Sequence, residues 1–207
     1  MIHEVDEAVR SFLREEALVG TEVEILLDAP TKDWAGRRTA PAVDLYLYDI
    51  REDVRRRTVG TVEARRPDGT VVDRRDPLRH FKLAYLLTAW TQRPEDEHRL
   101  LSGLLACLLR HDSVPAPHMV GSLAESGLPL GLTVASPPPE NRQVSDVWSA
   151  LGGELKASLD LVVTVHVDPA RITVPAPPIF EPLRVTIRDE EGGRSEDAPR
   201  RPEPARP

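Results

Sequence analysis

One continuous stretch, residues 78–111, places the strongest constraint on the fold of this chain. Its first part, residues 78–90, alternates in hydropathy with a period of two, which predicts a long β-strand. The apolar positions of one face are Phe81, Leu83, Tyr85, Leu87 and Ala89. The other face changes from polar to apolar toward Trp90, so we expect the strand to end where both faces are covered.

A leucine-rich helix is predicted to follow this strand directly. Thr91 is expected to cap it, Pro94 suits the first turn, and the acidic run Glu95-Asp96-Glu97 suits the positive end of the helix dipole. Pairs of leucines then repeat every four residues, at Leu100, Leu101, Leu104, Leu105, Leu108 and Leu109. An apolar stripe of this width predicts packing against a sheet, so strand, turn and helix form the predicted core unit.

The remaining elements follow from the same two periodicities. An amphipathic helix is predicted at residues 2–15 and a short helix at 143–151, while residues 28–41 and 111–121 are expected to be irregular. Further strands are predicted at residues 23–27, 43–50, 128–135 and 155–167. Taken alone, these patterns predict a soluble α+β domain of residues 1–174 that binds something.

An arginine-rich segment, residues 51–79, predicts a projecting β-hairpin with its turn at Pro67-Asp68-Gly69. A basic arm on a chain of net charge −7 favours contact with another copy or a charged partner, and a solvated hairpin is the alternative. The arginines proposed for an assembly interface are Arg55, Arg56, Arg57, Arg65, Arg66, Arg74 and Arg75.

The C-terminal part changes in composition. Residues 175–188 are proline-rich and predict an extended arm that contains a short strand with Leu183, Val185 and Ile187. We expect this strand to pair with a sheet edge or a neighbouring molecule, and a plain linker is the alternative. Residues 189–207 are charged and rich in glycine and proline, which predicts a disordered tail.

Composition argues against several classes of protein. No apolar run reaches the roughly 18 residues that a membrane span requires, and the first residues do not have the pattern of a secretory signal, so we expect a cytoplasmic protein. The single cysteine, Cys107, excludes an internal disulfide framework and is expected to be a small buried hydrophobe.

The sequence contains no motif typical of catalysis or of cofactor or metal binding. The sequence contains no phosphate-binding loop and no histidine spacing typical of a metal site, and a proline-rich loop separates His111 from His118. Asp160 and His166 share a strand face but would lie about 20 Å apart. We therefore predict no catalytic, cofactor-binding or metal-binding residues, and no enzyme. Nucleic-acid binding is also disfavoured, because acids interrupt the arginines and the hairpin has no stacking aromatics.

Several segments together resemble a known family. They are the first helix, the strand at residues 43–48, the motif Tyr85-Leu86-Leu87-Thr88-Ala89-Trp90, and the helix end Trp148-Ser149-Ala150-Leu151-Gly152-Gly153. In this order they resemble the amino-terminal domain of the cap, or tail-terminator, proteins of phage-tail-like contractile injection systems. The resemblance extends to about Val174.

The resemblance implies both a fold and a role. The fold would be a mixed, mainly antiparallel β-sheet packed against two or three α-helices. The role would be structural: a ring, expected to be hexameric, that ends the inner tube and sheath at the end distal to the baseplate. No catalytic residue or cofactor comes with this family. Another adaptor or baseplate component of the same particle is the alternative, and a nucleic-acid-binding protein is a weaker one.

Overall fold

The computed structural model describes residues 1–67, 71–137, 144–169 and 172–173. This part of the chain divides into two compact units. The larger unit comprises Met1–Val62 and Asp76–Arg171, and the smaller comprises Glu63–Arg75 with the residues that follow from Ile172.

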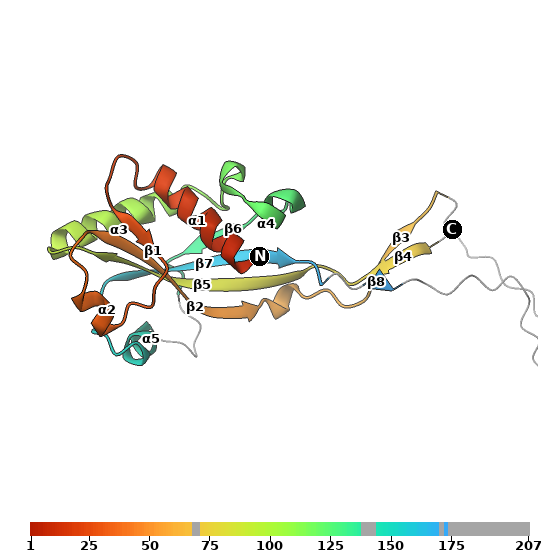
Figure 1. The fold of residues 1–207 in the computed structure, drawn as a ribbon. Coiled ribbons are helices and arrows are strands. Elements are labelled where there is room, and N and C mark those ends of the chain that lie inside the picture. The colour runs from red at the N-terminus through yellow and green to blue at the C-terminus, as the bar shows by residue number, and fades with distance from the viewer. Residues whose placement is uncertain (68–70, 138–143, 170–171, 174–207) are drawn as a thin grey trace, which may run out of the picture. The chain divides into compact units, whose positions relative to one another are not determined.

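The long alternating stretch forms β5 (Arg79–Trp90), the middle strand of a five-stranded sheet (Figure 1). The strand order is β1-β2-β5-β7-β6. β1 runs parallel to β2, and the other neighbours are antiparallel, so the predicted mixed, mainly antiparallel sheet is confirmed. The other four strands are β1 (Glu24–Leu26), β2 (Ala42–Glu52), β6 (Gly131–Val134) and β7 (Ser158–Val167).

Helices cover both faces of this sheet (Figure 1). One face carries α1 (Ile2–Glu16), α3 (Pro94–Leu108) and the short α4 (Gly121–Ser126). The opposite face carries α2 (Lys32–Gly36) and α5 (Val144–Ala150). Within the described residues, every helix is too short or too polar to span a lipid bilayer.

The main core lies between the sheet and helices α1 and α3. The predicted apolar face of β5 is confirmed, because Leu83, Tyr85 and Leu87 are fully buried. Each buried large apolar side chain contributes roughly 1.5–3 kcal/mol to folding. The side chains of α1 and α3 that are buried in the same cluster are Val5, Ala8, Val9, Phe12, Leu13, Leu101, Leu104, Cys107 and Leu108.

Two side chains of α1, Asp6 and Glu4, make polar contacts that hold the helix in place. The hydroxyl of Tyr85 donates to the Asp6 carboxylate at 2.7 Å, which ties α1 to the central strand. The Glu4 carboxylate accepts from the backbone N–H of Ser122 at 3.1 Å and from the Ser122 hydroxyl, and these bonds lower the pKa of Glu4 to about 2. Gly121 has φ of +52°, and a Cβ there would lie 2.3 Å from a Glu4 oxygen, so this contact requires glycine.

The second face of β5 is covered near Trp90, as its change from polar to apolar predicted. The rings of Trp34 and Trp148 lie 5.2 and 6.5 Å from the Trp90 ring, and they come from α2 and α5 respectively. Trp148 is only 2% exposed, whereas Trp90 remains partly exposed.

A buried acid lies on this second face. Asp44 of β2 pairs across the sheet with Thr88, is fully buried, and has no hydrogen-bond partner for either carboxylate oxygen within the described residues. Burial, reinforced by the nearby Asp28 carboxylate, raises the pKa of Asp44 to about 8. Asp44 is therefore largely protonated at neutral pH.

Several local predictions were wrong. The expected loop at residues 28–41 contains α2, which begins where the Thr31 hydroxyl accepts from the N–H of Trp34 at 3.3 Å. The expected irregular segment at residues 111–121 contains a 3₁₀ turn, η2 (Ala116–His118), and reaches the start of α4. Thr91 does not cap α3, because the cap position is Arg93. Leu109 lies beyond the helix end and is 68% exposed, so the leucine stripe is narrower than predicted.

The smaller unit contains the predicted hairpin. Its strands are β3 (Val62–Arg65) and β4 (Val71–Arg75), and Asp68 and Gly69 of the predicted turn lie outside the described residues. The hairpin is shorter than the predicted 51–79, because Arg51 and Arg79 belong to β2 and β5. A short third strand that the sequence did not indicate, β8 (Ile172–Thr173), pairs antiparallel with β4. The projection of the hairpin and the domain boundaries at 174 and 188 stay predictions.

The buried Asp44 gives a first testable prediction. A raised pKa in the folded state means that the stability from the neutral carboxyl is fully present below about pH 4 and is lost as the pH rises through about 8. The substitution Asp44→Asn keeps the shape of the side chain and removes its charge. We expect the variant to gain stability over the wild type by a few kcal/mol between pH 5 and pH 9, measured by urea unfolding. If the free energies of unfolding of the two proteins changed in parallel with pH, the raised pKa of Asp44 would be contradicted.

Candidate assembly surfaces

Three of the predicted interface arginines lie in the connection that leaves β2. Arg55, Arg56 and Arg57 are all exposed at the 3₁₀ turn η1 (Val54–Arg56) and its end. Arg57 lies 3.6 Å from a Glu52 oxygen, and Arg56 lies 4.0 Å from Asp53. Such exposed pairs contribute little to stability, so these side chains are free to exchange partners at small cost.

The neighbouring acid Asp53 is held more firmly. Its carboxylate is 2.9 Å from the Lys82 amine of β5, and this contact lowers the pKa of Asp53. Its backbone N–H donates to the His80 carbonyl at 2.8 Å, which extends the sheet pairing by one residue beyond β2. The turn that displays the arginines is therefore anchored to the central strand.

The other predicted arginines belong to the smaller unit, and acids in the same hairpin pair with three of them. Glu63 lies 2.5 Å from Arg65 and 3.0 Å from Arg74, and Asp73 lies 2.7 Å from Arg75. Arg66 is exposed in the loop that follows β3. Leu183, Val185 and Ile187 lie outside the described residues, and the role of all ten residues in assembly stays a prediction.

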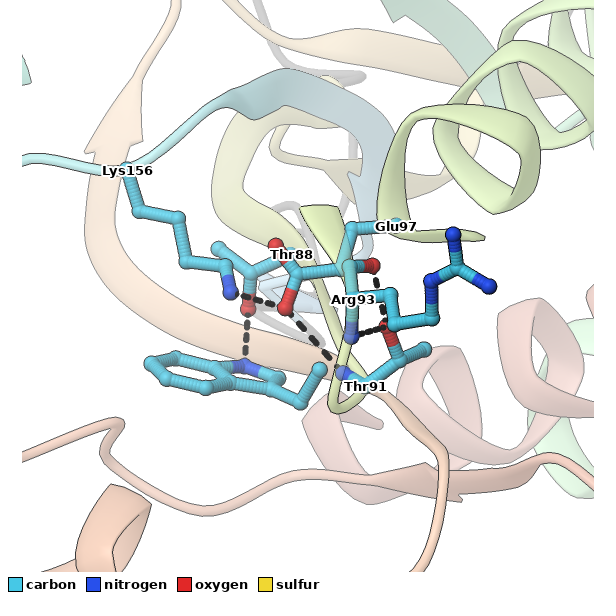
Figure 2. A network of polar contacts seen from close by, with 6 residues as sticks. Thr88, Thr91, Arg93, Glu97 and Lys156 are labelled. Atoms are coloured by element: carbon cyan, nitrogen blue, oxygen red, sulfur yellow. Dashed lines mark hydrogen bonds and ion pairs between the residues drawn. The ribbon is translucent and has the colours of Figure 1, made fainter. Parts of the chain in front are cut away.

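The sequence did not indicate a polar network that links β5, α3 and the segment before β7 (Figure 2). The Glu97 carboxylate accepts from the backbone N–H of Thr91 at 3.1 Å and lies 2.5 Å from the Lys156 amine. Lys156 also lies 4.3 Å from the centre of the Trp90 ring, a cation–π contact. The Trp90 indole N–H donates to the Thr88 hydroxyl at 2.8 Å. Together these contacts fix the turn that joins the central strand to its helix.

Two recesses adjoin Trp90 at the end of the central strand. A recess of about 670 Å³ is lined by Val23, Arg38, Pro41, Trp90, Arg93 and Leu100 among others. A second one, of about 350 Å³, lies beside Trp90, Trp148, Leu155 and Lys156. Leu155, expected in a strand, precedes β7 and is 69% exposed at the edge of the second recess.

One cluster contains the residue types of a catalytic triad but not its geometry. The Ser11 hydroxyl and the Glu15 carboxylate lie 3.0 and 4.0 Å from the same nitrogen, Nδ1, of the buried His118. A nucleophile relay needs the hydroxyl and the acid on opposite ring nitrogens, so this arrangement does not activate Ser11. Burial raises the pKa of Cys107, as expected for a core thiol.

The histidines and acids considered in the sequence have other partners. His111 donates through Nδ1 to the Cys107 carbonyl at 3.1 Å, and Phe12 packs against the rings of both His111 and His118. Asp160 accepts from the Tyr48 hydroxyl at 2.6 Å, while the His166 ring packs against His80. Among the described residues, no three histidine, cysteine, aspartate or glutamate side chains form a group that could hold a metal ion.

The described residues thus define the class of protein. It is an α+β domain in which the polar groups described above bond to other helices and strands of the same chain. The chain belongs to the family of the Pvc16 N-terminal domain, because the model of that family matches residues 4–181. The resemblance expected from the sequence is therefore confirmed. A comparison with curated protein sequences finds no match.

Two solved structures share the fold. One is the PVC sheath/tube terminator of an extracellular contractile injection system in its extended state, with 21% identity, a TM-score of 0.64, and coverage of 93% of this chain and 65% of that chain. The other is the tube-terminating cap of the anti-feeding prophage, with 24% identity, a TM-score of 0.56, and coverage of 88% and 60%. This chain thus spans between three fifths and two thirds of the length of those chains.

The network around Glu97 gives a second prediction. Glu97→Gln keeps an acceptor for the Thr91 N–H but leaves the Lys156 charge, 20% exposed, without its counter-ion. We expect a loss of roughly 1–2 kcal/mol in the free energy of unfolding, measured with urea.

The matched control for this prediction is Glu95→Gln in the same helical turn. Glu95 is 63% exposed and pairs with the exposed Arg93, so its loss should change stability by no more than about 0.5 kcal/mol. Equal effects of the two substitutions would show that the Glu97 network does not hold the turn.

Proposed function

We propose that this chain is the cap of a contractile injection system, which ends the inner tube and the sheath at the end distal to the baseplate. The observation that carries this proposal is the match of the Pvc16 N-terminal domain over residues 4–181. The shared fold with a sheath/tube terminator and a tube-terminating cap supports it. The role needs no catalytic residue and no cofactor.

The sheet edges of the larger unit suit a protein that stops polymerisation. The edge strands β1 and β6 have only three and four residues, and the segment at Ser113 forms a bridge with Gly131 on β6. Short or covered edges give another chain little backbone to pair with. A domain of this kind can occupy the end of a polymer without offering a sheet edge on which further subunits add.

The assembly contacts are proposed for both units. We infer a homo-oligomeric ring, hexameric in line with the family resemblance, in which Arg55, Arg56 and Arg57 and the hairpin arginines reach an adjacent subunit or the tube. The segment with Leu183, Val185 and Ile187 engages the sheath by strand addition. Pairing of the arginines with acids in the same chain argues against a phosphate-binding surface, so nucleic acid is not among the proposed partners. The protein is proposed to be made in the cytoplasm and assembled there into the particle.

Particles made without this chain test the main proposal. Electron microscopy should show tubes and sheaths of uncontrolled length with normal baseplates, because nothing ends their polymerisation. Particles that lack baseplates would instead favour an adaptor or baseplate role. Restoring the wild-type chain should restore uniform length. Val185→Pro removes a backbone N–H that the proposed strand addition would need, so this variant should leave the sheath end unattached.

Charge reversal tests the arginine turn. Replacing Arg55, Arg56 and Arg57 together by glutamate places like charges beside Glu52 and Asp53 and should disturb ring formation, measured by negative-stain microscopy and light scattering.

The matched control reverses three exposed arginines that pair locally on the helices, Arg10, Arg37 and Arg99. Normal rings and particles of normal length from the Arg55–Arg57 variant, or equal defects in the control, would remove this turn from the interface.

A further inference from the structure

Two histidines face each other across the central strands. His80 of β5 and His166 of β7 are directly opposite in the antiparallel register. Their ring centres lie 4.7 Å apart with an angle of 65° between the ring planes. Both side chains are half-buried. They lie at the end of the sheet that is remote from Trp90, on the same face as Ala84 and Lys82.

Each ring carries a buried nitrogen that nothing in the described structure satisfies. The Nδ1 atoms of both His80 and His166 are inaccessible to solvent and have no hydrogen-bond partner among the described residues. A buried imidazole nitrogen without a partner forfeits its hydration, and such groups in folded proteins usually have a ligand or a function.

We propose that His80 and His166 together bind a divalent transition metal of the class that prefers imidazole, such as Zn²⁺, with water in the remaining positions. Two nitrogens on one tetrahedral Zn²⁺ lie roughly 3.3 Å apart. The ring centres lie 4.7 Å apart, so the proposal requires one ring to turn about its Cβ–Cγ bond until a nitrogen of each ring reaches that separation and opens to water. This site is independent of the proposed cap function.

The surroundings set the strength of binding. Lys82 and Arg56 lie near the pair, but both are close to the Asp53 carboxylate, at 2.9 and 4.0 Å. This acid offsets part of their repulsion of a cation. With only two protein ligands, the site should bind less tightly than structural zinc sites, which have four.

Isothermal titration of Zn²⁺ into the full-length chain tests the proposal. We expect one Zn²⁺ per chain, and a loss of at least tenfold in affinity, about 1.4 kcal/mol, for either His80→Ala or His166→Ala. The control His98→Ala removes an exposed histidine of α3 and should leave the affinity unchanged. Wild-type affinity in both cross-strand variants would overturn the proposal.

A second measurement uses only the wild type, so it does not depend on the folding of a variant. In NMR spectra of the histidine rings, Zn²⁺ should shift the signals of His80 and His166 at one equivalent and leave those of His3 and His98 in place. Shifts confined to the exposed histidines would equally overturn the proposal.

Discussion

The pairing of β5 with β2 on one side and β7 on the other is the constraint on which the rest of the larger unit depends. β5 has partners along most of its twelve residues, so its backbone groups are satisfied while both of its faces are available for packing. One face receives α1 and α3, and the end of the other carries Trp90, which contacts Trp34 and Trp148. A strand buried in this way cannot shift by one residue, because the shift would move Leu83, Tyr85 and Leu87 out of the core.

The sequence predicted those parts of the fold that a long periodic pattern encodes. The alternation in β2, β5 and β7 and the helical spacing in α1 placed their core faces correctly, since many residues repeat the same signal. The short elements α2, α4 and β8 were missed because two to six residues are too few to show a period. Their positions depend on single contacts, such as the Thr31 cap of α2 and the Glu4 bonds to Ser122, which join α4 to the distant N-terminus.

The candidate surfaces were harder to predict, because acids in the same segments pair with the arginines. Runs of arginine suggested a basic arm, but Glu52, Asp53, Glu63 and Asp73 lie close enough to pair with several of these arginines. The interleaved acids in the sequence were the available signal, since residues two apart on a strand share a face. The contact between Glu97 and Lys156 joins residues 59 positions apart, so neither the α3 helical pattern nor the β7 strand pattern carries any trace of it.

This local neutralisation bears on how the arginine turn can act in an assembly. If Arg56 and Arg57 contact a neighbouring subunit, they exchange Asp53 and Glu52 for new acids, and an exchange between exposed pairs yields little net free energy. The affinity must then come from apolar surface, and Val54 and Val59 on either side of the arginines are 66% and 92% exposed. The arginines would set orientation and reject wrong partners, which is what charged groups at the rim of an interface do best. With its charges already paired within the chain, such an interface would be weak between two subunits and would become tight only where many copies bury their valines together.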